Sequence, residues 1–276
     1  MAGTIADLAN ALIDEIAKQS SVVVAFSGGV DSAVVAAAAY RALSDRAIAI
    51  TGIGPAVPES DLLDSRRVAA AIGIRHLEIS TTEILNESYV LNDSKRCYYC
   101  KSTLYSTLRK WADENGFHRL LSGTNLDDLG DYRPGLQAAL EFQVFAPLAQ
   151  LQVNKTQVRE LANYFELAVA DKPASPCLAS RIAYGQSVTP ERLKSIEQAE
   201  QFLNSVGFQD VRVRLHADGL VRLELNLGDL SKACEAAMRE RIQTKMREIG
   251  FKYVTLDLGG RQSGSMNRVL PVLRNI

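Results

Sequence analysis

The feature that most constrains the fold is a short apolar run followed directly by a glycine-rich loop and an alanine-rich segment. The run spans residues 22–26 (VVVAF), the loop spans 27–32 (SGGVDS), and the alanine-rich segment extends to about Leu43. A continuous apolar run of this length is typical of a strand that is buried on both faces of a parallel sheet. The order strand, loop, helix therefore predicts an α/β domain with the loop at the end of a central strand.

Strand-like and helix-like segments continue to alternate after this unit. Ile5, Leu8, Leu12 and Ile16 recur at helical spacing before it. The alternation predicts a Rossmann-like parallel sheet with helices on both faces. The further strands are expected at residues 47–53, 76–79 and 119–123, and the further helices at 60–72, 97–115 and 156–165.

The last hundred residues follow a different pattern, which predicts a small α+β domain. Thr189 before Pro190 predicts the start of a helix that runs to residue 206. Alternating segments on either side of Asp218-Gly219 predict a hairpin. A helix at 230–249 and a strand at 253–258 complete the domain.

Charge divides along the same line. Residues 1–176 hold 16 Lys and Arg against 21 Asp and Glu, or −5, whereas residues 177–276 hold 15 against 11, or +4. A proline-containing stretch at 172–176 lies at this change. We therefore expect a larger domain at 1–180 and a smaller one at 181–276.

Composition excludes several classes of protein. Hydrophobic residues make up 47% and charged residues 23%, with a net charge of −1, as in ordinary globular proteins. The near-neutral charge argues against a coat for duplex DNA or a polybasic membrane binder. The acidic N-terminal segment does not fit a signal peptide, and the longest apolar run, residues 33–40, is far shorter than the ~20 residues that span a bilayer. We expect a cytoplasmic protein, in which cysteines serve metal or redox chemistry more often than disulfides.

The glycine-rich loop has the composition of a phosphate-binding site. Gly28 and Gly29 allow a tight turn and a close approach of the ligand. The N–H groups at the start of the following helix would face an anion, and Ser27 and Ser32 add hydroxyl donors. Asp31 suits Mg²⁺, although a plain turn with Asp31 as the helix cap is the alternative interpretation. The chain has no Walker-type loop and no Gly-x-Gly-x-x-Gly fingerprint after a strand.

Residues 27–32 resemble the PP-loop of the ATP pyrophosphatases, which cleave ATP between the α and β phosphates and transfer AMP to an oxygen of the substrate. Segments 123–135 (GTNLDDLGDYRPG), 173–181 (PASPCLASR), 212–224 and 260–267 (GRQSGSMN) extend the resemblance to the LarE family of ATP-dependent sulfur transferases. The similarity runs from about Leu8 to Asn267. It implies ATP, Mg²⁺, a small-molecule pyridinium-3,5-biscarboxylic acid mononucleotide as substrate, and self-association.

A loop after the strand at 119–123 carries the second group of candidate nucleotide-site residues. Ligands bind at this edge of a parallel sheet, and carboxylates there suit Mg²⁺ on ATP phosphates. A solvated acidic turn is the alternative. The resemblance also allows Lys155 a role at the phosphates, although a plain surface lysine is the commoner interpretation. The candidate residues of the loop are Gly123, Thr124, Asp128, Asp131 and Arg133.

Arginines on the predicted hairpin are candidates for binding an anionic substrate. Arg212 and Arg214 are two residues apart, so they share one face of a strand, and Arg222 and Glu224 do the same on the partner strand. Paired arginines provide bidentate contacts to carboxylates and phosphates. A salt-bridged, solvated face is the alternative.

Cys177 is the candidate nucleophile. Pro173 and Pro176 stiffen its approach, and Ser180 and Arg181 follow it. A nearby cation such as Arg181 would favour the thiolate. A buried structural cysteine is the alternative.

Three of the four cysteines are expected to act together. Cys97 and Cys100 are three apart and share a helical face, whereas Cys234 falls on an apolar helical face and is expected in the core. The resemblance implies two family forms: one gives up the sulfur of the cysteine matching Cys177, and the other has three cysteines matching Cys97, Cys100 and Cys177. The second form resembles [4Fe-4S]-dependent thiolases, and we favour it.

Other functions remain as alternatives. A PP-loop tRNA thiolase shares the three-cysteine logic, but the charge of −1 does not favour nucleic acid as a partner. A synthetase using ammonia would need a glutaminase domain, and a nucleotide sensor would not need Cys177 on a stiffened loop. A protein that donates sulfur is a further expected partner of the cluster form.

Overall fold

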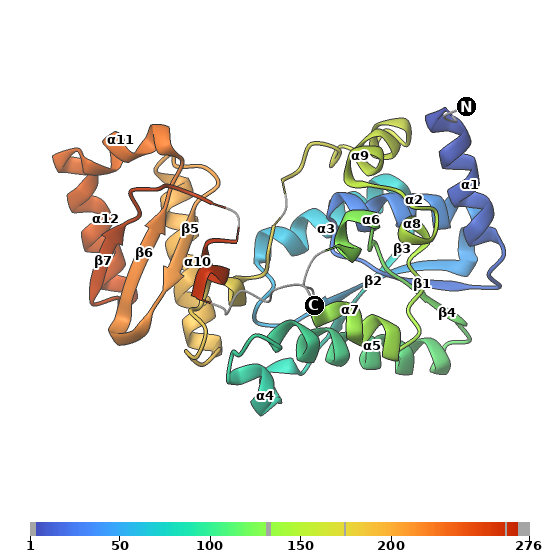
Figure 1. The fold of residues 1–276 in the computed structure, drawn as a ribbon, viewed down its shortest axis with the longest axis horizontal. Coiled ribbons are helices and arrows are strands. Elements are labelled where there is room, and N and C mark those ends of the chain that lie inside the picture. The colour runs from blue at the N-terminus through green and yellow to red at the C-terminus, as the bar shows by residue number, and fades with distance from the viewer. Residues whose placement is uncertain (1–3, 131–133, 174, 263, 270–276) are drawn as a thin grey trace. The chain divides into compact units, whose positions relative to one another are not determined.

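The computed structural model describes residues 4–130, 134–173, 175–262 and 264–269 (Figure 1). The chain forms two compact units. The larger unit comprises Met1–Asn86 and Cys97–Ser175, and the smaller unit comprises Glu87–Arg96 and Pro176–Ile276. These units are defined by packing, and the division into domains at residue 180 stays a prediction.

The larger unit is built on a parallel sheet of four strands in the order β3-β2-β1-β4. The strands are β1 (Val22–Ala25), β2 (Ala47–Ile53), β3 (Arg75–Ser80) and β4 (Arg119–Leu121), and all neighbours run in the same direction. Phe145 adds one further parallel bridge beside β4. The predicted α/β class is therefore confirmed.

Helices cover both faces of this sheet (Figure 1). In β1, Val22 and Val24 belong to one hydrophobic cluster and Val23 to the other, which explains why the run is apolar without interruption. One face packs against α1 (Ile5–Ala17), α2 (Val30–Leu43), α3 (Glu59–Ile72) and α9 (Lys155–Tyr164), and the other packs against α5 (Arg96–Glu114) and α7 (Pro134–Glu141).

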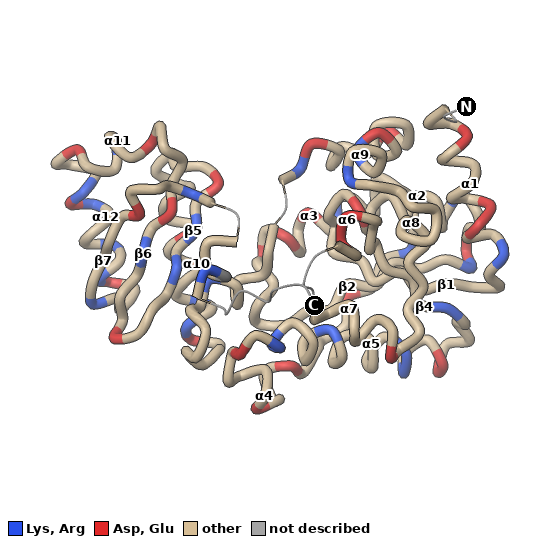
Figure 2. Tube along the Cα trace, in the orientation of Figure 1, with Lys and Arg blue, Asp and Glu red and all other residues tan. Residues whose placement is uncertain are grey.

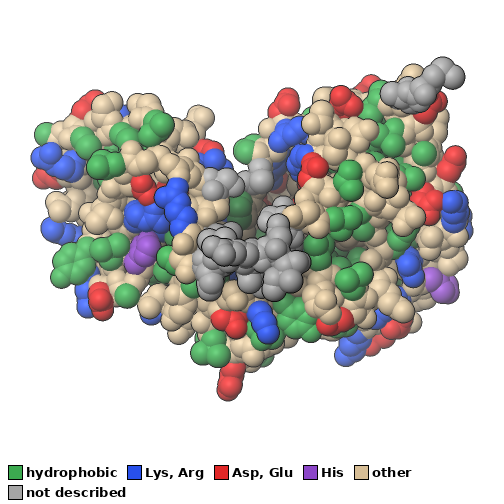
Figure 3. Space-filling model, in the orientation of Figure 1, with side chains coloured by type: hydrophobic (Ala, Val, Ile, Leu, Met, Phe, Trp, Pro, Cys, Tyr) green, Lys and Arg blue, Asp and Glu red, His purple; other side chains and the backbone are tan. Residues whose placement is uncertain are grey.

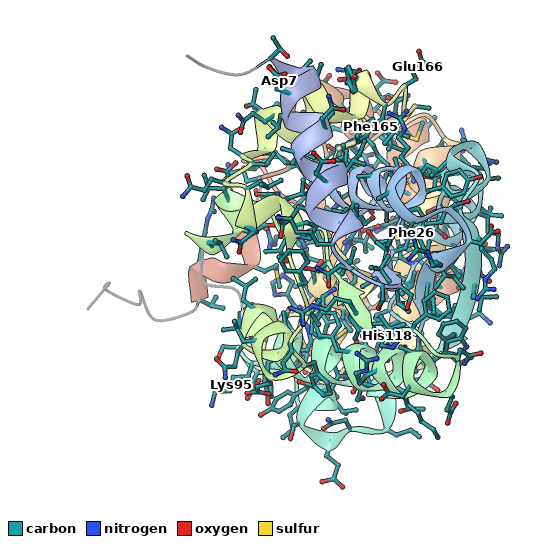
Figure 4. The ribbon with its side chains drawn as sticks, turned by 90° about the vertical axis from the view of Figure 1, so that its right-hand side faces the viewer. Asp7, Phe26, Lys95, His118, Phe165 and Glu166 are labelled. Carbon is teal, nitrogen blue, oxygen red and sulfur yellow. The ribbon has the colours of Figure 1, made fainter. Side chains whose placement is uncertain are left out.

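Local capping explains where the first helix begins. The side chain of Thr4 accepts a hydrogen bond from the N–H of Asp7, and the Asp7 carboxylate accepts one from the N–H of Thr4, a capping box at the first turn of α1 (Figure 4). None of the helices in the described part of the chain combines the length and the apolar character needed to cross a membrane.

The smaller unit contains a sheet of three strands in the order β5-β6-β7. Strands β5 (Arg212–Leu215) and β6 (Leu220–Glu224) are antiparallel, as the hairpin prediction requires, and β7 (Tyr253–Leu256) is parallel to β6. Helix α10 (Pro190–Ser205) begins at the expected cap, Thr189, whose hydroxyl accepts from the N–H of Arg192. The short α4 (Glu87–Val90) also belongs to this unit.

The single helix predicted at 230–249 is wrong, and so is the placing of Cys234 in the core. The structure has two helices, α11 (Leu230–Cys234) and α12 (Ala236–Ile249). Glu235 between them has ψ 139°, an extended conformation that interrupts the helical repeat. Because the apolar stripe is not continuous across this break, Cys234 is exposed while Ile242 and Met246 remain buried.

Candidate functional site

Two loops meet at the carboxyl edge of the larger sheet, where the strand order reverses. Strand β1 has β2 on one side and β4 on the other, so the loops after β1 and β4 lie at a topological switch point. A Cβ atom on Gly123, just after β4, would lie 2.7 Å from the backbone N of Ser32 and 2.8 Å from the carbonyl C of Asp31. The two loops are therefore in direct backbone contact, and glycine is required there.

The PP-loop after β1 is a tight turn held by its own serines. Ser32 Oγ donates to the Gly29 carbonyl at 3.0 Å and accepts from the Ser27 N–H at 3.2 Å. Gly28 has φ +69°, and a Cβ atom there would lie 2.7 Å from Cα of Ser65 in α3. Helix α2 begins at Gly29 without any side-chain cap, so its first N–H groups suit an anion.

Asp31, in the first turn of α2, binds partners from two other segments. The Lys155 ammonium lies 2.5 Å from Asp31 Oδ2, and the Asn125 amide donates to Asp31 Oδ1 at 3.0 Å. Lys155 is thus part of the PP-loop site rather than a plain surface lysine. Asn125, which is 2% exposed, was missed in the sequence, although an Asn before Leu-Asp-Asp is a recognisable helix cap.

The acidic residues of the second loop bind backbone N–H groups at helix starts. The Asn125 side chain accepts from the N–H groups of Asp127 and Asp128, while Asp128 Oδ2 accepts from the Asn125 N–H at 3.1 Å. These bonds form the capping box of α6 (Leu126–Leu129), where Figure 2 shows acidic positions. Asp127 Oδ2 accepts from the Lys155 N–H at 2.8 Å, at the start of α9. The Thr124 hydroxyl lies 3.0 Å from that of Ser122.

Not every predicted residue of this loop can be placed. Asp131 and Arg133 lie outside the described residues. Their roles as ligands of Mg²⁺ and phosphate stay predictions. Asp31 is the carboxylate that the structure places in the PP-loop itself.

The loop of Cys177 is held by one buried arginine of the smaller unit. Arg181 is 2% exposed, and its Nη1 donates to the Pro176 carbonyl, to the Cys177 carbonyl at 3.1 Å and to Ser180 Oγ at 3.1 Å. Glu200 in α10 accepts from Arg181 Nε at 3.0 Å and Nη2 at 3.2 Å. Glu200 was not predicted from the sequence, because nothing in α10 marks one glutamate among several as a partner.

The charged residues of the hairpin lie on one face. The register sets Arg212 opposite Glu224 and Arg214 opposite Arg222. Glu224 is fully buried and accepts from Arg214 Nε at 2.9 Å, from Arg222 Nη1 at 3.0 Å and from Ser265 Oγ at 2.6 Å. An anion that binds this face must therefore compete with Glu224 for the guanidinium groups of Arg214 and Arg222.

Arg212 and His216 sit in partly buried surroundings on the same unit. The Arg212 Nη1 group donates to the Val211 carbonyl at 2.7 Å, and burial, with Arg181 adding to it, lowers the pKa of Arg212. The space-filling view shows a histidine beside Lys and Arg side chains (Figure 3). His216 Nε2 accepts from Arg222 Nε at 3.3 Å, and burial, together with the charge of Arg222, lowers the pKa of this histidine.

The candidate cluster cysteines are thiols outside any disulfide, and they belong to different units. Cys97 is exposed and Cys100 half-buried in the first turn of α5, within the larger unit, while Cys177 is half-buried in the smaller unit. Across the described ranges, 4–130, 134–173, 175–262 and 264–269, no group of three or more His, Cys, Asp and Glu side chains gathers to hold a metal ion. Cys177 therefore belongs to one unit, and Cys97 and Cys100 belong to the other.

Comparison with known proteins identifies a matching family model and several similar proteins. The family model of NAD synthase matches residues 4–113, which include the PP-loop. The chain is 44% identical over 248 residues to the uncharacterised protein slr1717 of Synechocystis, covering 90% of this chain and 92% of that one. It is 32% identical over 196 residues to the tRNA-specific 2-thiouridylase MnmA of Rickettsia africae, covering 57% and 53%.

One relative of assigned activity matches over almost its whole length. The chain is 34% identical over 272 residues to the pyridinium-3,5-bisthiocarboxylic acid mononucleotide synthase of Lactiplantibacillus plantarum, covering 97% of this chain and 96% of the synthase. This match spans both units, the PP-loop, the Cys177 loop and the charged hairpin. The chain therefore belongs to the LarE family of ATP-dependent sulfurtransferases.

Proposed function

We propose that this enzyme adenylates a carboxylate of pyridinium-3,5-biscarboxylic acid mononucleotide and converts it to a thiocarboxylate, a step in the synthesis of the nickel-pincer nucleotide cofactor. The observation that carries the proposal is the match of 97% of the chain to a synthase of the bisthiocarboxylic acid product. The PP-loop at the switch point of the sheet supports ATP as the activating substrate.

In the first step, the residues of the larger unit would bind ATP. The uncapped N–H groups of α2 and the hydroxyls of Ser27 and Ser32 bind the phosphates. Asp31 would hold the Mg²⁺ of the nucleotide, and Lys155, which contacts Asp31, would move to a phosphate oxygen. A carboxylate oxygen of the substrate then attacks the α-phosphorus, the bond to the β-phosphate oxygen breaks, and pyrophosphate leaves with the charge that these groups stabilise.

In the second step, a sulfur nucleophile attacks the carbonyl carbon of the acyl-adenylate, and AMP leaves with the electron pair of the broken C–O bond. We propose that Arg212, Arg214 and Arg222 bind the anionic groups of the substrate, with Glu224 setting the orientation of the guanidinium groups. Arg181 holds the Cys177 loop in place by donating hydrogen bonds to the backbone carbonyls of Pro176 and Cys177.

The sulfur donor has two candidate forms. In the favoured form, Cys97, Cys100 and Cys177 would hold a [4Fe-4S] cluster, which would supply the sulfide. All three are thiols outside any disulfide, and thiolates are the ligands such a cluster needs. In the alternative form, Cys177 gives its own sulfur: the Cβ–Sγ bond breaks, the α-proton is lost, and dehydroalanine remains.

The adenylation step is tested by its products. Incubation with ATP and the biscarboxylic mononucleotide is expected to release AMP and pyrophosphate, and Asp31→Asn is expected to abolish the release. Asp45→Asn, an exposed aspartate of the same unit, is the matched control and should keep wild-type rates. Formation of ADP and phosphate instead would contradict the proposal.

The sulfur donor is tested on the protein itself. After anaerobic reconstitution with iron and sulfide, a broad visible absorption band is expected that Cys97→Ala abolishes and that Cys234→Ala, at an exposed cysteine, leaves unchanged. Loss of the elements of H₂S from Cys177 in the intact mass after turnover would instead establish the sacrificial route. Self-association and delivery of sulfur by a partner protein are further proposals from the family resemblance.

A second candidate function is thiolation of tRNA. The match to the thiouridylases favours it, but it covers only 57% of this chain. Binding of tRNA at physiological salt, together with thiolation of a uridine, would place this function first. We expect neither, because the net charge of −1 offers little attraction to a phosphate backbone.

A further inference from the structure

Asn125 connects the PP-loop to the loop after β4 through both ends of its side chain. Its amide nitrogen donates to Asp31 Oδ1 at 3.0 Å, and its amide oxygen accepts from the N–H groups of Asp127 at 3.0 Å and Asp128 at 3.3 Å. Asn125 itself is 2% exposed, so water reaches these bonds only from the side of their partners. A buried amide that is used at both ends fixes what it touches more firmly than an exposed one.

The surroundings leave Asp31 little freedom. The absence of a side chain at Gly123 lets the backbone of the second loop pack directly against the backbone of Asp31 and Ser32. Asp31 Oδ2 faces the ammonium of Lys155, whereas Oδ1 faces the amide of Asn125. The two oxygens thus have different partners. The partner of Oδ2 is the charged side chain of Lys155, which a metal cation can replace. The partner of Oδ1 is the neutral amide of Asn125, which the capping box holds in place.

We propose that Asn125 is a positioning residue for Asp31. It holds Oδ1 in place while Oδ2 exchanges its partner, Lys155, for the cation that arrives with the nucleotide. A side-chain amide suits this role, because its nitrogen donates to a carboxylate while its oxygen, a separate atom, accepts backbone N–H bonds. The inference rests on the proposed adenylation and adds a residue to it.

The chain contains a matched control for this proposal. Asn154 caps α9 with the same kind of capping box: its side chain accepts from the Gln157 N–H at 2.9 Å, and Gln157 Oε1 accepts from the Asn154 N–H at 3.0 Å. Asp is as good a helix cap as Asn, so Asn→Asp preserves the cap at both sites. The substitution differs in its surroundings, since at position 125 it replaces the donor to Asp31 by a second carboxylate and the box partner is Asp128, whereas the box partner of Asn154 is the neutral Gln157.

The experiment compares Asn125→Asp with Asn154→Asp in the full chain. The rate of pyrophosphate exchange into ATP, measured with substrate, is expected to fall by about tenfold to a hundredfold for Asn125→Asp, the loss of one bond to a charged group, and to stay within about twofold for Asn154→Asp. Binding of Mn²⁺ without nucleotide, followed by electron paramagnetic resonance, is expected to tighten severalfold only for Asn125→Asp, because hard cations bind paired carboxylates. A purely structural defect would not strengthen cation binding.

Asn125→Ser provides the second test should Asn125→Asp not fold. Serine keeps the cap but is too short to reach Asp31, so the exchange rate is expected to fall by about tenfold while Mn²⁺ binding stays as in wild type. Equal behaviour of the 125 and 154 variants would overturn the inference. Absence of exchange in the wild-type enzyme would instead overturn the proposed function, and the contrast in Mn²⁺ binding would still report on Asn125.

Discussion

At the scale of single residues, two histidines make stability depend on pH. Burial lowers the pKa of His76, with Arg66 adding to the effect and Glu78 opposing it, and His76 Nε2 lies 2.8 Å from the Thr51 hydroxyl. Burial and Arg222 lower the pKa of His216 in the same direction. Below the unfolded-state pKa of about 6.5, the unfolded chain therefore binds protons that the folded chain does not.

The contribution of these two histidines to the free energy of unfolding is thus expected to be fully present above about pH 6.5. It decreases as the pH falls toward their lowered folded-state pKa values. His76→Gln and His216→Gln should each reduce this slope, measured by urea unfolding between pH 7.5 and 5. His118→Gln, at an exposed histidine bonded to Ser21, is the control. If neither His76→Gln nor His216→Gln changed the dependence of the free energy of unfolding on pH, the assignment of this dependence to the two histidines would be wrong.

Residue types were easier to predict than residue partners. The sequence singled out Asp31 and Arg181 by their motifs, but their partners come from other segments: Lys155 for Asp31 and Glu200 for Arg181. A buried guanidinium group needs an acceptor, because burying a charge alone is costly. That requirement predicts that a partner exists and does not say which of many carboxylates it is.

At the scale of elements, the PP-loop depends on how closely it packs against α3. Gly28 has φ +69°, and a Cβ atom there would lie 2.7 Å from Cα and 2.9 Å from N of Ser65. Gly28→Ala is expected to cost about 3 kcal/mol or more, since it combines a disfavoured backbone with a clash against another backbone. Thermal unfolding and ATP binding by calorimetry should both show the loss.

Gly116→Ala is the control for this prediction. Gly116 lies in the same unit at φ +74°, but nothing lies within 4 Å of its would-be Cβ atom. This variant is expected to lose only about 1–2 kcal/mol, the cost of the left-handed conformation, and to bind ATP as wild type does. Equal losses in both variants would mean that contact with α3 does not shape the loop.

Periodicity located the long elements and missed the short ones. The strands and helices of the sheet, and the cap of α10, lie where alternation and Thr189-Pro190 predicted them. The helices α6, α7 and α8 (Pro147–Gln150) have four to eight residues, too few to show a helical repeat. Between α11 and α12 the apolar spacing continues in the sequence, but the extended backbone at Glu235 divides the stripe in the structure, because a side-chain pattern does not report backbone conformation.

At the scale of the whole molecule, the chain leaves the larger unit at residue 87 and returns at residue 97. Asn92 anchors this excursion within the smaller unit. It is fully buried, with φ +56°, and its amide nitrogen donates to the carbonyls of Ile182 at 3.3 Å, Ala183 at 2.9 Å and Gln186 at 2.9 Å. Arg96 Nη1 adds a bond to the Ala179 carbonyl at 2.9 Å.

The smaller unit should therefore depend on a segment that lies about eighty residues earlier in the chain. Asn92→Gly suits the left-handed backbone and removes the side chain, so the three carbonyls lose a buried donor and Arg96 Nη1 loses the Asn92 Oδ1 acceptor, at a cost of about 2–4 kcal/mol. Asp218→Gly, an exposed residue of the same unit at φ +58°, is the matched control and should change the free energy of unfolding by less than about 1 kcal/mol. Denaturant unfolding of the full chain measures both, and equal effects would show that segment 87–96 rests on the smaller unit without stabilising it.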